Sequence, residues 1–344
     1  MKKFLSLMLV LVMVMSLAAC GEKIPVADDK TRGGSENGYT IPAEVMNMVW
    51  AAGPTGGVTY PLGAAVSEMI STKVAPGARI TLLEGAGASN VELCNSGEAL
   101  LGHTMGDTAF CAVNGLAPFD GVKENFRVWA RVSDFQFQFI VPASLGVSSF
   151  EEIKEKGIKL NLGTNTAGSS AEAITRYVLE AYGITYDWIK EHGGSTTFTS
   201  FSDGVVLMQD GHINAWGALS AAPNSFITEM NMSQQMVLLP VSEDVMKELS
   251  EAYGYAIGEV PANAYEGQTE AVPTLLSPMV LICNAALPDD FMYEVTKNLF
   301  TDEMVESLKA VSTTLTVDPA YSSQNLGGPI HPGAEMYYKE LGVL

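Results

Sequence analysis

The sequence predicts an α/β fold with mostly parallel sheets. Stretches with strand-like patterns are followed along the chain by stretches of helical periodicity. A unit in which a strand ends in a loop of glycine, serine or threonine, with a helix directly after it, occurs three times. The length of 344 residues is enough for two domains. In such sheets ligands bind at the carboxyl ends of the strands, where all three loops lie.

The first 19 residues have the composition of an export signal. Lys2 and Lys3 precede an apolar run over residues 4–14, which is short for a membrane span. The small residues before Cys20 resemble a bacterial lipobox, which implies cleavage ahead of Cys20 and a lipid on its sulfur. The alternative is an ordinary signal peptide with a chance cysteine. Residues 20–43 are mostly polar and predict a flexible tether, so we expect an extracytoplasmic protein held at a membrane surface.

Charge and cysteine usage narrow the function classes. The net charge of −20 becomes −22 once Lys2 and Lys3 are removed, which disfavours nucleic acid as a partner. No second apolar stretch is long enough to cross a bilayer, so this chain is not itself a channel or transporter. The remaining cysteines, Cys94, Cys111 and Cys283, lack a C-x-x-C spacing. We expect them to be buried structural thiols.

The first strand–loop–helix unit spans residues 49–68. Gly53, Gly56 and Gly57 allow the backbone to approach a ligand where a Cβ would clash. The helix that follows directs its unpaired N–H groups back toward the loop, an arrangement that binds anions. The alternative is a strand-to-helix turn that needs glycine only for its geometry.

The second and third units repeat this layout. Residues 79–96 read as a strand, a Gly-rich loop and a helix, with Ser89 or Asn90 as the helix cap. Residues 158–182 read in the same way, with the helix ended by Gly183.

One alternative for the second loop is a dinucleotide site. Gly85-x-Gly87-x-x-Asn90 is close to the fingerprint, and Asp107 follows at a suitable distance. The third glycine is missing, however, and an exported lipoprotein has no obvious nicotinamide supply. We therefore expect no cofactor.

The other elements follow from local patterns. Ser149 and Glu152 have capping-box spacing at the start of a short helix. Residues 103–107 read as a polar loop after a short strand. We expect strands over residues 128–132, 135–142, 212–218, 237–240 and 273–284, and helices over residues 201–210, 243–253, 289–299 and 302–311.

Nothing in the sequence marks an enzyme. The Gly-x-Ser-x-Gly, His-Glu-x-x-His and Walker motifs are missing. The four histidines, His103, His192, His212 and His331, have no metal-ligand spacing, so we expect no metal site. His103 and Asp107 lie four residues apart, but the neighbouring glycines argue against a helix that would pair them.

Several runs of residues, in order along the chain, resemble one family. These runs lie at residues 53–63, 84–90, 163–170, 261–274, 287–297 and 330–338. On these runs the chain is similar, over residues 48–344, to extracytoplasmic solute-binding proteins of the TAXI group, the receptor subunits of TRAP-type secondary transporters.

The resemblance implies a two-lobe, periplasmic-binding-protein-like (type II) α/β fold with a ligand cleft between the lobes. Lobe 1 would comprise residues 44–137 and 276–344, and lobe 2 residues 138–275. The implied function is capture of a small carboxylate, glutamate-like or dicarboxylate, for delivery to TRAP membrane subunits, and we expect a monomer. The alternatives are a receptor for a sensor kinase and a surface lipoprotein hydrolase.

The resemblance also implies ligand-binding residues. Arg131 is our candidate for a charged clamp, because it ends a strand; the alternative is a solvated or interlobe arginine. The run His103–Asp107 departs from the family's aliphatic-Gln-Ser-Asp pattern, which leaves the ligand's identity open. His331 would be structural. The carried-over residues are Thr55, Gly56, Gly57, Tyr60 and Ser89 in one lobe and Thr164, Ser169, Ser170, Ala222 and Pro223 in the other.

Overall fold

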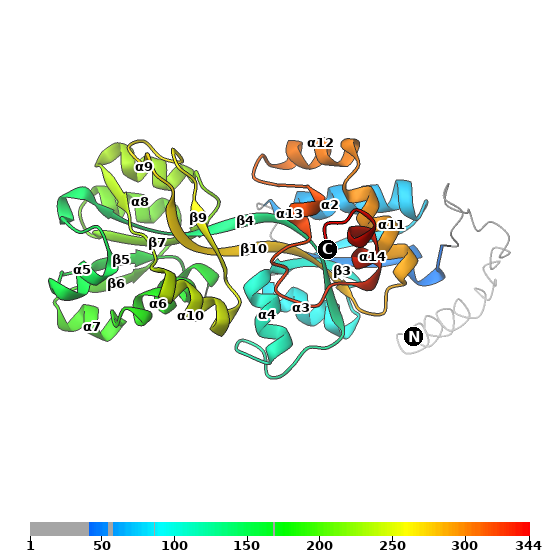
Figure 1. Ribbon diagram of the computed structural model, residues 1–344, viewed down its shortest axis with the longest axis horizontal. Helices are drawn as coiled ribbons and strands as arrows, with labels where there is room; N and C mark the ends of the chain where they lie inside the picture. The colour runs from blue at the N-terminus through cyan, green and yellow to red at the C-terminus, as the bar shows by residue number, and fades with distance from the viewer. Residues whose placement is uncertain (1–40, 54–57, 86, 168) are drawn as a thin grey trace, which may run out of the picture.

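Two long strands organise the molecule. The computed structural model describes residues 41–53, 58–85, 87–167 and 169–344. In these residues, β4 (Phe126–Pro142) and β10 (Val272–Asn284) run antiparallel from one group of elements into the other (Figure 1).

One group of elements, which we call the first lobe, combines segments from both ends of the described chain. Its strands are β1 (Asn47–Ala52), β2 (Arg79–Glu84) and β3 (Leu101–Met105). Its early helices are η1 (Ala43–Met46), α2 (Thr59–Met69), the π-helical η2 (Ile70–Val74), α3 (Gly87–Ser96) and α4 (Gly106–Asn114). Its late helices are α11 (Asp289–Leu299), α12 (Asp302–Val311), α13 (Pro319–Ser322) and α14 (Pro332–Glu340).

The other group, the second lobe, is formed by the continuous stretch between the two long strands. Its strands are β5 (Asn161–Thr164), β6 (Ser195–Phe198), β7 (Ala215–Ser220), β8 (Met236–Leu238) and β9 (Ala256–Val260). Its helices are η3 (Ala143–Leu145), α5 (Phe150–Glu155), α6 (Ser170–Ala181), α7 (Tyr186–Glu191), α8 (Phe201–Gln209), α9 (Ser225–Ser233) and α10 (Glu243–Tyr253).

The hydrophobic core is divided in the same way. Two clusters of buried apolar residues draw all their buried members from residues 41–132 and 279–338. The other two draw theirs from residues 137–275. The long strands therefore pass from one core to the other between residues 132 and 137 and between residues 275 and 279. Each lobe buries its own apolar side chains, as an independent folding unit does.

The predicted α/β class is confirmed, but the expectation of mostly parallel sheets is wrong. Strands pair in the order β2-β1-β3-β10-β4-β7-β5-β6, with β8 on β4 and β9 on β10. Pairing is parallel among β1, β2 and β3 and among β5, β6 and β7. Every pairing of β4 or β10 with another strand is antiparallel, and Val128 on β4 also forms an isolated parallel bridge with Ile330. The local strand–helix pattern predicts the parallel triplets, whereas the pairing of β4 with β10 joins segments over 130 residues apart.

Several element boundaries agree with the local signals. α10, α11 and α12 begin and end at the predicted residues. The Ser149 hydroxyl caps α5 by accepting the Glu152 N–H at 3.3 Å. Gly183, with φ of +69°, follows α6 as predicted.

Three local predictions are corrected. Residues 128–132 and 135–142 belong to one strand, β4, because β10 pairs with it along most of its length. Residues 103–107 are not a loop: β3 ends at Met105 and α4 begins at Gly106. α3 begins at Gly87, so neither Ser89 nor Asn90 is its cap.

Buried polar groups outside the sheet are mostly structural. His331 is fully buried: its Nδ1 accepts the Gly333 N–H at 3.1 Å, and its Nε2 lies 3.0 Å from the Leu287 carbonyl. It therefore holds the start of α14 against the segment before α11, as expected of a structural histidine. Cys94, Cys111 and Cys283 are free and buried, as predicted, and burial raises the pKa of Cys94 to about 12.

Candidate functional site

A cavity of about 560 Å³ lies between the two lobes. The first lobe contributes the starts of α3 and α4 and the loop after α4. The second lobe contributes the first two turns of α6 and the residues at the end of α10. The lining residues are Gly87, Ala88, Asp107, Thr108, Cys111, Ala117, Pro118, Ser169, Ser170, Glu172, Ala173, Arg176, Tyr177, Tyr253 and Tyr255.

The cavity is placed by three strand–helix junctions. β2 leads into α3, β3 into α4 and β5 into α6, so three helix N-termini meet at the carboxyl ends of parallel strands. The first N–H groups of each helix have no partner within it, and they carry the positive end of the helix dipole. The arrangement therefore favours an anionic group wherever no protein carboxylate is already in place.

The start of α3 is fixed by hydrogen bonds to neighbouring strands. The Asn90 side-chain N–H₂ donates to the carbonyls of Ala52 (3.2 Å) and His103 (2.9 Å). The Thr104 hydroxyl donates to the Gly87 carbonyl at 2.9 Å. Asn90 and Thr104 are fully buried. Gly87 and Ala88 thus line the cavity from a position that these hydrogen bonds fix.

The start of α4 already contains a carboxylate. Asp107, in the first turn of α4, is only 8% exposed and accepts a hydrogen bond from the Ser277 hydroxyl on β10. Burial, the largest cause, raises the pKa of Asp107, while its hydrogen bonds act in the opposite direction. Because Asp107 occupies this N-terminus, α4 offers less attraction to a ligand anion than α3 does.

The start of α6 is held by its own cap and by a hydroxyl chain to the sheet. The Ser169 hydroxyl accepts the Glu172 N–H at 3.3 Å. Thr175 donates to the Ala171 carbonyl at 2.6 Å and lies 3.3 Å from the Thr164 hydroxyl. Thr164 in turn donates to the Gly217 carbonyl at 3.0 Å. These contacts fix the face of α6 that borders the cavity.

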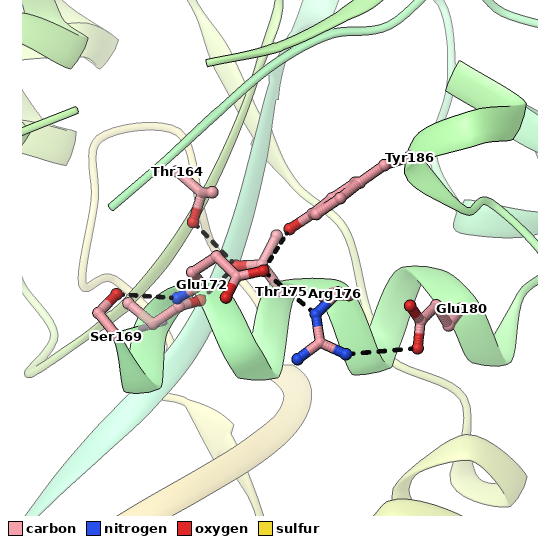
Figure 2. A network of polar contacts seen from close by, with 8 residues as sticks. Thr164, Ser169, Glu172, Thr175, Arg176, Glu180 and Tyr186 are labelled. Atoms are coloured by element: carbon pink, nitrogen blue, oxygen red, sulfur yellow. Dashed lines mark hydrogen bonds and ion pairs between the residues drawn. The ribbon is translucent and has the colours of Figure 1, made fainter. Parts of the chain in front are cut away.

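Arg176 is the one cation among the described lining residues of this cavity. Its Nε lies 3.2 Å from Glu172, and its Nη1 lies 3.7 Å from Glu180 (Figure 2). The Tyr186 hydroxyl also donates to Glu172, at 2.8 Å. The guanidinium lies 4.6 Å from the centre of the Tyr177 ring. Glu172, Glu180 and Tyr177 therefore hold Arg176 along the wall of the cleft.

The structure brings some of the predicted ligand residues to this cavity. Ser169 and Ser170 line it. Thr164 is fully buried beneath α6, where its hydroxyl positions the helix and does not reach the cavity. Ser89 lies in the first turn of α3 and is exposed, outside the cavity lining.

Other predicted residues lie elsewhere or outside the described residues. Tyr60 starts α2 and packs against the first-lobe core. The Ala222 N–H donates to the Gln136 side chain at 3.0 Å, and Ala222 packs on the second-lobe core; neither it nor Pro223 lines the cavity. Four predicted residues lie outside the described residues: Thr55, Gly56, Gly57 and the lipidation site Cys20.

Arg131 is engaged within the first lobe. Its Nε donates to Asp134 at 2.9 Å, and its guanidinium lies 4.1 Å from the Tyr321 ring centre. A register shift leaves Val132 without a partner on β10, and this bulge turns Arg131 and Asp134 to the same face of β4. Arg131 is not among the residues that line the interlobe cavity.

Sequence reasoning missed most of the charged and aromatic lining. Asp107 was considered only as part of a dinucleotide fingerprint, as a partner of His103 and as the end of a run that departs from the family pattern, and Arg176 and the tyrosines were not singled out. The acid–base spacing Glu172, Arg176, Glu180 was visible as an i, i+4 ladder. Such ladders usually lie on solvated helix faces, so the pattern alone did not indicate a cleft.

Two kinds of feature are missing from the described ranges. No helix there has the length and apolar content needed to cross a membrane. In the same ranges, no group of three or more histidine, cysteine, aspartate or glutamate side chains is arranged to hold a metal ion.

Comparison with known proteins identifies a family and a fold. The sequence pattern of the NMT1-like family matches residues 50–342. A TctC solute-binding protein from Polaromonas has 16% identity and a TM-score of 0.52, covering 87% of this chain and 98% of that one. PhnD1 from Prochlorococcus marinus, solved with methylphosphonate, has 13% identity and a TM-score of 0.47. The match covers 87% of this chain and 98% of that one. The aliphatic sulphonate-binding protein SsuA from Escherichia coli has 13% identity and a TM-score of 0.43. The match covers 86% of this chain and 78% of that one. At such identities only the fold is comparable.

Proposed function

The chain belongs to the NMT1-like family, and on that premise we propose that it is an extracytoplasmic solute-binding receptor of an import system. The observation that carries the proposal is the cavity of about 560 Å³ between two separately cored lobes. A solute held there touches both lobes at once. Sites of this kind, concave and with a few convergent polar groups, are typical of small-molecule binding.

The mechanism we propose is capture by population shift. A solute that contacts the α3 side and the α6 side together makes more contacts when the lobes are close than when they are apart. The two strands β4 and β10 are the connections that would flex. Hydrogen bonds to a charged group contribute about 1.5–3 kcal/mol each, so two or three would be enough for micromolar affinity after ordering costs.

The solute we propose is a small carboxylate. Its carboxylate would accept hydrogen bonds from the backbone at Gly87 and Ala88, which line the cavity at the start of α3, and from the Arg176 guanidinium on the opposite lobe. Ser169 and Ser170 add hydroxyl groups on the second lobe. We further propose that the membrane partners are TRAP-type subunits, as the sequence resemblance implies, and that Cys20 carries a lipid anchor.

The first test is ligand binding by the purified protein. A panel of mono- and dicarboxylates is screened by thermal shift, because a ligand that binds only the folded state raises Tm. Arg176→Met should lower the affinity for any hit by at least tenfold. Arg79→Met is the matched control, since Arg79 is exposed at the amino end of β2, away from the cavity. If no carboxylate raises Tm while a neutral sugar does, the proposed ligand class is wrong.

Turnover and anchoring are tested separately. A surface hydrolase would convert the bound compound, whereas a receptor returns it unchanged, which mass spectrometry of the recovered ligand decides. A receptor for a sensor kinase would bind the same ligand but would not be required for its uptake by cells.

A Cys20→Ser variant should leave the membrane fraction and appear in the soluble fraction. Membrane association unaffected by that change would rule out the lipid anchor.

A further inference from the structure

One hydrogen bond joins the crossing strand β10 to the wall of the cavity. Resting on the proposed function, we propose that Ser277 on β10 is a positioning residue: through its hydrogen bond to Asp107 it links the hinge between the lobes to the space that a solute would occupy. We call this pair of residues the latch. Ser277 is not among the described residues that line the cavity, so any effect it has on binding passes through Asp107.

The hinge is located by the positions at which the two long strands change partners. On the second-lobe side, β7 pairs with β4 from Gln136 onward, and β9 pairs with β10 as far as Leu276. On the first-lobe side, β3 pairs with β10 from Met279. Phe135 and Ser277, which are paired with each other, lie between these ranges. The step at which both strands pass from one lobe to the other therefore includes Ser277.

The second lobe holds both strands up to this step. The Gln136 side chain accepts the Ala222 N–H at 3.0 Å. The Thr274 hydroxyl, which is 2% exposed, donates to the Phe137 carbonyl at 2.7 Å and so joins β10 to β4. These contacts make β4 from Gln136 onward, and β10 up to Thr274, part of the second lobe.

The first lobe holds β4 by several contacts at the other side of the step. The Ser133 hydroxyl donates to the Thr314 carbonyl at 3.0 Å. Asp134 accepts from the Arg131 Nε at 2.9 Å, and the two form an ion pair. Loss of one of these contacts would therefore still leave β4 attached to the first lobe.

The corresponding contact of β10 is the latch. Ser277 is fully buried, and its hydroxyl donates to the Asp107 carboxylate in the first turn of α4. Asp107 also lines the cavity, so one carboxylate contacts both the hinge strand and the space for the solute. A solute that contacts Asp107 thus acts on the group to which the hinge strand is tied.

Removal of the latch should loosen the hinge. β10 would then lack this tie between Thr274, which the second lobe holds, and Met279, where pairing with β3 begins. The lobes would adopt a wider range of arrangements without solute. Apparent affinity falls in proportion to the fraction of molecules that are ready to bind. One hydrogen bond to a charged group is enough to change such a fraction about tenfold.

The first measurement needs no solute. Small-angle scattering of the mature protein gives its radius of gyration, which Ser277→Ala should increase by more than the spread of repeat measurements. Ser133→Ala is the matched control: it removes a hydroxyl that is 1% exposed from the neighbouring strand, but its bond goes to Thr314 and not to a cavity residue. Because the Arg131–Asp134 pair remains, the control should keep the wild-type radius.

A second set of variants assigns the effect to the bond with Asp107. Asp107→Ala breaks the same bond from its other end and should increase the radius by as much. Adding Ser277→Ala to it should then change nothing further, because coupled residues give non-additive effects. For any carboxylate that raises Tm, Ser277→Ala should weaken binding about tenfold, and Ser133→Ala by less than about threefold.

Three results would overturn the latch. They are an unchanged radius in Ser277→Ala, an equal increase in Ser133→Ala, and additive increases from Ser277→Ala and Asp107→Ala. If no carboxylate binds, the proposed ligand class fails, while the scattering comparison still decides for or against the latch. If Ser277→Ala does not fold, Asp107→Ala tests the same hydrogen bond, and a wild-type radius in that variant would overturn the proposal.

Discussion

At the scale of single residues, buried ionisable side chains determine how stability depends on pH. His103 on β3 is 6% exposed, and burial lowers its pKa to about 4. In the unfolded chain its pKa is about 6.5, so the folded state takes up a proton less readily. The contribution of neutral His103 to folding stability is fully present above the unfolded pKa of about 6.5. It is lost as the pH falls toward the folded pKa of about 4. At pH 5 we expect His103 alone to remove about 2 kcal/mol.

The test of this expectation is urea unfolding at pH 7 and at pH 5. His103→Gln keeps a polar side chain but does not titrate, so the difference in unfolding free energy between the two pH values should shrink. His331 acts in the same direction, because burial lowers its pKa as well. His192→Gln serves as the control, since His192 is exposed on the second lobe. An equal loss of stability in His103→Gln and the wild type would contradict the assignment.

Asp107 has the opposite dependence. Its folded-state pKa is raised, so its contribution to stability is present below the unfolded pKa and is lost as the pH rises through the folded value. At pH 7 Asp107 therefore contributes less to the stability of the fold than it does in acid. We expect Asp107→Asn to have a Tm at pH 7 equal to or above that of the wild type, measured by calorimetry without ligand. A lower Tm would mean that the carboxylate is a net stabilising group.

At the scale of elements, the bulge in β4 gives Arg131 its partner. Arg131 and Asp134 have side chains 7% and 15% exposed, and each is the other's ion-pair partner. Removing one member of such a pair leaves a charge uncompensated, which costs about 3 kcal/mol. We expect Arg131→Met to destabilise by roughly that amount in urea unfolding, and Arg131→Met/Asp134→Leu to recover most of it.

The same variants decide between two roles for Arg131. If it only fixes β4, ligand affinity in the double variant should stay within about threefold of the wild type. A loss of more than tenfold in affinity with normal stability would instead support the ligand clamp predicted from the sequence. Arg176→Met, measured in the same titration, shows how much ligand affinity is lost when a residue that lines the cleft is substituted.

The sequence could predict those helices and strands that local signals define. The boundaries of α10, α11 and α12 follow from caps and periodicity, and the three strand–loop–helix units follow from small residues between patterned segments. The continuity of β4 was not predictable in this way, because it depends on pairing with β10, far along the chain. The position of Arg176 in a cleft depends on how one lobe faces the other. Ser169 and Ser170 were predicted because they lie in the run of residues 163–170 that resembles the family, in a loop of small residues directly before a helix.

At the scale of the whole molecule, the lobes touch beside the cleft. Gly254 ends α10 with φ of +76°, and a Cβ on it would lie 2.3 Å from the Cβ of Phe110 on α4. Glycine here therefore has two functions: it adopts a left-handed conformation, and it lets the second lobe approach the first. The contact is next to Tyr253 and Tyr255, which line the cavity.

The last prediction separates these two functions of Gly254. Gly254→Ala adds both backbone strain and a clash with Phe110, so the lobes can no longer come as close. Gly211→Ala is the matched control, because Gly211 follows α8 with φ of +72° and a Cβ there meets nothing within 4 Å. Both variants should lose about 1 kcal/mol of stability from strain. Only Gly254→Ala should also weaken solute binding, by tenfold or more, and keep the radius of gyration in small-angle scattering large when solute is added. Equal binding by the two variants would show that closure does not need this contact, and the capture mechanism would then have to act without α4 and α10 meeting.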